Sequence, residues 1–203
     1  MKPLASNSCI EYPFFSDQEC LDGIEYSWDK KGHFDNSNVE LQNSIYTSDQ
    51  VTTANYFKYN FFADNPDYIE RFIKILKECL SWIIYPIAVQ SWVNIYNVGE
   101  GIKWHTHGGL SFHSYTANIF LGGETKPGIS YMEPGTHVST IENKLGVMLI
   151  SNCSFWHMVQ PNESNKIRYS IGITIHDYEA ITQEILEGAS LNSPNKGTIL
   201  LNG

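Results

Sequence analysis

The stretch from Ala88 to Ile175 restricts the fold of this chain more than any other feature, because short apolar runs alternate there with turn residues. The runs are rich in β-branched and aromatic residues, which favour strands, and turn signals such as Gly122-Gly123 separate them. Short strands that follow one another without helices predict an antiparallel barrel or jelly roll. The expected strands cover residues 88–96, 115–121, 129–133, 137–142, 146–151, 155–159 and 167–175.

The segment before this stretch has the apolar spacing of a helix. Asn65 and Pro66 form a typical helix start, in which a capping side chain precedes a proline in the first turn, and Pro86 marks the end. The spacing predicts an amphipathic helix over 66–84. Its apolar residues are Ile69, Phe72, Ile73, Leu76, Leu80, Ile83 and Ile84.

Two shorter helices are expected, at 17–30 and from Tyr178 to Leu186. No repeat or obvious linker divides the chain, so we expect a single domain over 1–203 that is mainly β, with flanking helices at both ends. Its expected parts are a helical N-terminal buttress (1–87), a jelly-roll core (88–176) and a C-terminal helix and tail (177–203).

Charge and cysteine content limit the partners and the compartment. The chain has 13 Lys and Arg against 22 Asp and Glu, a formal charge of -9, which disfavours nucleic acid as a partner. The four cysteines are scattered without a CxxC pair, as is typical of reduced thiols in an intracellular protein. Because no apolar run has the length of a signal peptide or a membrane span, we expect a cytoplasmic protein that does not bind membranes.

His105 and His107 follow an aromatic, β-branched run and a loop that contains glycine. Residues at i and i+2 of an extended chain project to the same side, so these two imidazoles can converge on one point. Neutral imidazole is a common ligand for iron, zinc, copper and nickel. The spacing therefore indicates a metal site; the alternative is the polar face of an edge strand.

A third ligand is expected from a distant strand, because a closed barrel brings sequence-remote strands side by side. His157 lies in the apolar run FWHMVQP, where a buried imidazole needs a polar partner. A metal would supply that partner, and a hydrogen bond to a backbone carbonyl is the alternative.

Arg168 opens the run RYSIGITI, whose alternation puts Arg168, Ser170, Gly172 and Thr174 on one face of the predicted strand. An arginine directed into a barrel is costly unless it meets an anion. Its planar fork suits a carboxylate, and the Ser170 hydroxyl can add a hydrogen bond. The pattern predicts a site for an acidic small molecule, the alternative being an exterior arginine at the start of the strand.

Taken together, these residues resemble the iron(II)- and 2-oxoglutarate-dependent oxygenases. That family has an H-x-D/E…H metal set, which is similar to the HTH motif followed by His157 in this chain. The family's downstream R-x-S is similar to Arg168-Tyr169-Ser170. The similarity extends roughly from Gln90 to Ile175, and NIYNVGEGIKWHTH and NIFLGGET look like the corresponding segments of prolyl hydroxylase-like members. HTHGGLSFHSY resembles a branch of hydroxylase-like proteins with an H-x-H.

The resemblance implies a double-stranded β-helix, the cupin-like form of the jelly roll, that binds iron(II), 2-oxoglutarate and dioxygen. It implies hydroxylation of an unactivated C–H bond in a peptide side chain or a small molecule. His105, His107 and His157 would be the metal ligands, and with Arg168 they would form the catalytic set.

The co-substrate would be held from the barrel wall. The resemblance implies that Arg168 and Ser170 bind the far carboxylate of 2-oxoglutarate and that Tyr96 and Asn118 add hydrogen bonds. A homodimer that uses the apolar surface of the 66–84 helix is a further possibility.

His107 departs from the family pattern, since it stands where the family's usual acidic ligand falls. Three neutral ligands leave the metal more positive by one charge, which favours a dianionic co-substrate. Glu100 or Glu124 could instead supply the acid, and His113 is a spare ligand. Two other classes stay open: a three-histidine cupin metalloenzyme that does not use 2-oxoglutarate, and a jelly-roll binding or structural module.

Overall fold

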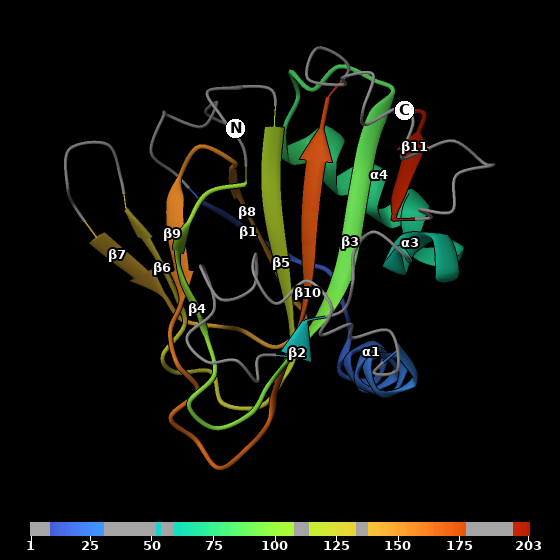
Figure 1. Cartoon of the computed structure of the whole chain (residues 1–203). Coiled ribbons are helices and arrows are strands. Elements are labelled where there is room, and N and C mark those ends of the chain that lie inside the picture. Colours follow the sequence, from blue (N-terminus) through green and yellow to red (C-terminus); the bar gives the residue numbers. More distant parts are fainter. Residues whose placement is uncertain (1–8, 31–51, 54–58, 108–113, 133–137, 178–196) are drawn as a thin grey trace.

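The computed structural model describes residues 9–30, 52–53, 59–107, 114–132, 138–177 and 197–203 (Figure 1). Its strands form two antiparallel sheets, which confirms the predicted mainly β, jelly-roll class. The seven-stranded sheet has the order β1 (Ile10–Pro13), β8 (Val147–Asn152), β5 (Ser114–Gly122), β10 (Arg168–His176), β3 (Ile87–Tyr96) and β11 (Thr198–Leu201), with β2 (Thr52–Thr53) also paired to β3. The four-stranded sheet has the order β4 (Ile102–His105), β9 (Trp156–Val159), β6 (Ile129–Met132) and β7 (Val138–Ile141).

The strands expected between 88 and 175 are present with nearly the predicted bounds, because their alternation and turn residues are strong local signals. Four short strands were not predicted: β1, β2, β4 and β11. Strand β1 lies in the segment that was expected to be helical, and β11 lies in the expected helix and tail. Each pairs with a strand distant in the sequence, β1 with β8, β2 and β11 with β3, and β4 with β9, so tertiary pairing rather than local sequence stabilises them. The division of the chain at 87 and 177 stays a prediction.

The helices are α1 (Asp17–Asp29), α3 (Phe61–Asp64), the 3-10 turn η3 (Pro66–Tyr68) and α4 (Ile69–Cys79). The helix expected at 17–30 is confirmed, and its start is capped reciprocally by Ser16 and Glu19. The helix expected from Tyr178 to Leu186 lies outside the described residues. No helix in the described ranges is long and apolar enough to cross a bilayer.

The prediction of one helix over 66–84 is wrong at both ends. Asn65 makes no side-chain cap, and the α-helix ends at Cys79, where Leu80 leaves the helical region with φ -124° and ψ 63°. The apolar spacing continues beyond this point because Leu80 and Ile83 are still buried, although the backbone there is no longer helical.

The large sheet has one apolar and one polar face. Alternate residues such as Val93, Ile171 and Ile173 belong to the main core, together with phenylalanines of α3 and α4. The other face is directed toward the small sheet (Figure 1), and register pairs such as Ser170 with Asn94 lie on it. Since residues that pair across neighbouring strands share a face, this inner surface is polar along three adjacent strands.

Gly172 shapes this inner face by leaving room for the Trp92 side chain. The two residues pair across β10 and β3, and a Cβ atom on Gly172 would lie only 2.7 Å from Cε2 and 2.8 Å from Cζ2 of the Trp92 indole. Any side chain at position 172 would therefore force the indole to move.

Substitution Gly172→Ala is expected to lower the free energy of unfolding by about 1–3 kcal/mol, because the added methyl group overlaps the indole. Urea unfolding followed by circular dichroism measures this change. A Trp92→Leu background removes the overlapping atoms, so the same substitution should cost less there. An equal cost in both backgrounds would show that the indole is not what limits the space at position 172.

Candidate metal centre

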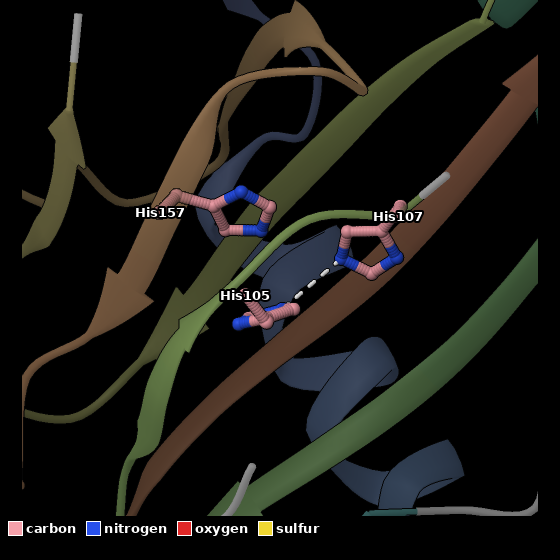
Figure 2. Close-up of side chains that lie close together, drawn as sticks. All are labelled: His105, His107 and His157. Carbon is pink, nitrogen blue, oxygen red and sulfur yellow. Dashed lines mark hydrogen bonds between the residues drawn. The ribbon is translucent and has the colours of Figure 1, made fainter. Parts of the chain in front are cut away.

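Strands β4 and β9 bring two histidines together. His105 and His157 are register partners in the small sheet, next to an irregularity between Ile102 and His105 that redirects the end of β4. His107 follows beyond the strand, and its backbone N–H donates to the Cys153 carbonyl over 3.3 Å. The three rings point toward one another (Figure 2), with candidate ligand nitrogens all within 4.8 Å of each other.

Backbone carbonyls determine which nitrogen of each strand histidine carries the proton. His105 Nδ1 lies 2.8 Å from the Lys103 carbonyl oxygen, and His157 Nδ1 lies 3.0 Å from that of Phe155. A carbonyl oxygen only accepts, so each Nδ1 is the donor and each Nε2 keeps a free lone pair. Metal-binding histidines commonly have this arrangement, in which the second nitrogen donates to a carbonyl.

The alternative partner predicted for His157, a backbone carbonyl, is therefore present together with the histidine cluster. Nδ1 donates to the carbonyl of Phe155, and the opposite edge of the ring faces the other two histidines, with ring centroids 4.4 Å from His105 and 5.1 Å from His107.

The Nε2 atoms of His105 and His107 are 3.2 Å apart (Figure 2). Because the His105 nitrogen is an acceptor, His107 donates to it when no cation is bound. A metal ion would take the place of that shared proton. The spacing suits two ligands of one ion, since metal–nitrogen distances near 2.0–2.1 Å put neighbouring ligand nitrogens about 3 Å apart.

The surroundings keep the three imidazoles neutral. Burial, with a smaller contribution from nearby His105, lowers the pKa of His157 to about 4. Burial, and then the proximity of His157 and His105, holds the pKa of His107 well below its ordinary value, and burial also lowers the pKa of His105. Neutral imidazole is the form that binds metals, so no ring has to lose a positive charge first, and His107 only has to carry its proton on Nδ1 instead of Nε2.

Within the described residues, the cluster contains no carboxylate. The Glu100 carboxylate is buried and accepts hydrogen bonds from the backbone and side chain of Asn97, and neither Glu100 nor Glu124 belongs to the cluster. His113 lies outside the described residues. Three neutral nitrogen donors suit iron, zinc, copper or nickel.

A cavity opens beside the three histidines between the two sheets. Its empty volume is about 460 Å³, part of it open to solvent. The polar face of the large sheet contributes Asn94, Tyr96, Thr116 and Asn118, and the small sheet contributes Tyr131. Tyr96 and Asn118, which were predicted to bind the co-substrate, thus line this cavity, and so does Asn94, which was not predicted.

Arg168 is buried, with only 2% of its surface exposed, so the exterior position considered for it is wrong. Its terminal nitrogens donate to the carbonyl oxygens of Gln160 (2.8 Å) and Pro127 (3.3 Å), and its Cζ lies 5.4 Å from the centre of the Tyr96 ring. It makes no ion pair with any described residue, and its Nε has no hydrogen-bond partner there. A guanidinium keeps its charge in proteins even though burial lowers the pKa of Arg168, so Arg168 is a buried charge without a carboxylate partner among the described residues.

Ser170 lies next to Arg168 on the same face of β10. Its hydroxyl oxygen is 3.2 Å from the amide nitrogen of Asn118 and 3.4 Å from that of Asn94. The four residues predicted to bind the co-substrate therefore lie on one surface: Arg168, Ser170, Tyr96 and Asn118. Across β10 and β3, Arg168 pairs with Tyr96, and Ser170 pairs with Asn94.

Comparison with solved structures finds the same fold in prolyl hydroxylases and in a protein solved with nickel and 2-oxoglutarate. The prolyl hydroxylase of Trichoplax adhaerens, solved with a hypoxia-inducible factor peptide, has a TM-score of 0.65 at 15% identity, covering 87% of this chain and 87% of that one. The viral collagen prolyl hydroxylase of Paramecium bursaria Chlorella virus 1, solved with 2-oxoglutarate, has a TM-score of 0.56 at 16% identity, covering 82% and 95%. HygX of Streptomyces hygroscopicus, solved with nickel and 2-oxoglutarate, has a TM-score of 0.56 at 10% identity, covering 89% and 90%.

At these identities the likeness shows the fold. The sequence itself matches no protein-family model and has no significant match among curated proteins.

Substitution His157→Ala is expected to weaken metal binding by at least about 100-fold, since even outer-sphere changes cost 10–100-fold. Titration of metal-free protein with zinc or iron(II) under anaerobic conditions measures this affinity. His176→Gln is the matched control, because His176 is a strand histidine outside the cluster that contacts Ser114. Equal losses in both variants, or no loss in His157→Ala, would contradict a three-histidine metal centre.

Proposed function

We propose that this protein is a non-haem iron(II)- and 2-oxoglutarate-dependent dioxygenase that hydroxylates an unactivated C–H bond of a peptide side chain or a small molecule. The observation that carries the proposal is the buried Arg168, which has no acidic partner in the described part of the chain and lies on the same inner face as residues that line the histidine cavity. A metal site alone does not call for such a cation, whereas a co-substrate with a second carboxylate does.

The chain's own residues have separable tasks in this proposal. His105, His107 and His157 would hold the metal ion, leaving positions for other ligands because they supply three donors. Arg168, with Ser170 and Asn118 beside it, would bind the far carboxylate of 2-oxoglutarate. Iron(II) with 2-oxoglutarate and dioxygen would supply the oxidising chemistry, yielding succinate and carbon dioxide with the hydroxylated product.

The side chains around the cavity support these separate roles for the histidines and for Arg168. The cavity is lined from the small sheet by Ile102, Ile129 and Val159. These apolar side chains limit the access of water, which strengthens a charge pair between Arg168 and a bound carboxylate. Tyr96 lines the cavity and its ring lies against the Arg168 guanidinium, and this contact helps to orient the fork.

Substitution Arg168→Lys is expected to weaken 2-oxoglutarate binding about 10- to 100-fold, because lysine keeps the charge but lacks the bidentate fork. The visible absorption produced when a 2-oxo acid chelates iron(II) reports binding in anaerobic titrations. Arg71→Lys is the matched control, since Arg71 pairs with Glu19 on the helical side of the protein. Wild-type protein that shows no absorption, or an Arg168→Lys variant that binds as tightly as wild type, would remove the co-substrate assignment.

Succinate formation separates this proposal from a three-histidine cupin that does not use 2-oxoglutarate. With iron(II), 2-oxoglutarate, ascorbate and oxygen, slow uncoupled turnover is expected to release succinate, and candidate peptides can then be screened for faster release. Protein that consumes oxygen without forming succinate would favour the cupin class. Protein that binds no metal at all would favour the jelly-roll binding module.

A further inference from the structure

Asn94 is a buried amide whose hydrogen bonds are incomplete. It lies in β3 with 3% of its surface exposed, lines the cavity, and pairs in register with Ser170 of β10. Its Nδ2 lies 3.4 Å from Ser170 Oγ, and its buried Oδ1 has no partner among the described residues. A buried polar atom without a partner is rare and calls for an explanation.

The hydrogen bonds of Ser170 show which orientation of the Asn94 amide is better. With Nδ2 toward Ser170, the hydroxyl oxygen faces two amide donors, one from Asn94 and one from Asn118, and Asn94 Oδ1 is left unsatisfied. Turning the Asn94 amide by 180° exchanges two groups of nearly equal size. Ser170 then donates to Asn94 Oδ1 and accepts from Asn118, and the amide nitrogen of Asn94 takes the position of the unsatisfied atom.

This orientation adds a second N–H donor beside Arg168. Asn94 pairs with Ser170 and Arg168 pairs with Tyr96, so Asn94 and Arg168 are diagonal neighbours on the inner face of the sheet. The Arg168 Nε is likewise a buried donor without a partner among the described residues. The described residues that line the cavity include no aspartate or glutamate that could accept from either group.

We propose that Asn94 is a further ligand-binding residue, whose amide N–H donates to the carboxylate that Arg168 binds. The inference rests on the proposed function for the identity of the ligand, a dicarboxylic 2-oxo acid. Asn94 would contact that ligand directly, in addition to its hydrogen bond with Ser170. The pair of donors would make the site select an ionised carboxylate over a neutral amide or an alkyl group of the same size.

Substitution Asn94→Asp separates direct binding from support of Ser170. An aspartate still accepts the hydrogen bond from the Ser170 hydroxyl, so a purely supporting role survives the change. It offers no donor, however, and it places a negative charge beside the ligand carboxylate. Calorimetric titration of the metal-loaded protein with 2-oxoglutarate is expected to show affinity at least about 100-fold weaker, and Asn94→Ala about tenfold weaker.

Gln90→Glu is the matched control. Gln90 lies on the same strand, and its amide nitrogen donates to Thr198 Oγ1 of β11 over 3.1 Å, away from Ser170. The change makes the same conversion of amide to carboxylate in β3 and is expected to leave 2-oxoglutarate affinity within about twofold of wild type. Urea unfolding of each variant shows whether it is folded, and if Asn94→Asp does not fold, an Asn94→Ala variant with wild-type affinity for 2-oxoglutarate would overturn the role of Asn94.

The outcomes distinguish this inference from the proposed function. Wild-type protein that binds metal but not 2-oxoglutarate would overturn the proposed function and with it the ligand named here. Wild-type protein that binds 2-oxoglutarate, together with Asn94→Asp of equal affinity, would overturn the role of Asn94 alone. Loss of affinity in Gln90→Glu equal to that in Asn94→Asp would also overturn it, because a general charge effect would then explain both.

Discussion

The antiparallel pairing of β10 with β3 and β5 is the constraint on which the rest of the structure depends. In this register Ile171 and Ile173 lie in the main core, while Arg168 and Ser170 lie on the opposite face. A slip of one residue would exchange the two faces and put the guanidinium among phenylalanines. The burial of the apolar face, worth about 1.5–3 kcal/mol for each large side chain, therefore also holds the polar face toward the cavity.

The small sheet provides the complementary half of the site through its backbone. His105 and His157 pair across β4 and β9, and each donates from Nδ1 to the carbonyl of the residue two positions earlier. The same local contact thus sets the protonated nitrogen of both rings. The geometry of two of the three imidazoles comes from strand backbone, and only His107 depends on a segment beyond the strand, where Cys153 accepts from its backbone N–H.

Much of this site could be predicted from the sequence because its signals are local or periodic. The alternation after Arg168 follows directly from strand geometry, and the i, i+2 spacing of His105 and His107 indicated the pair although His107 lies beyond the end of β4. Edge strands such as β4 could not be predicted, since four residues of mixed polarity are stabilised by a distant strand. Asn94 was missed for a similar reason: an asparagine in a β-rich run has no distinctive spacing, and its importance appears only when Ser170 is paired with it.

Three imidazoles line the cavity and the Arg168 guanidinium lies against Tyr96 of its wall, and we propose that one dicarboxylate spans the distance between them. A crystal structure of the protein with nickel and 2-oxoglutarate tests it most directly. We expect one ion with the Nε2 atoms of His105, His107 and His157 at about 2.0–2.2 Å, and the far carboxylate of the same molecule against Arg168. An ion bound elsewhere, or a 2-oxoglutarate molecule whose far carboxylate does not contact Arg168, would contradict the claim.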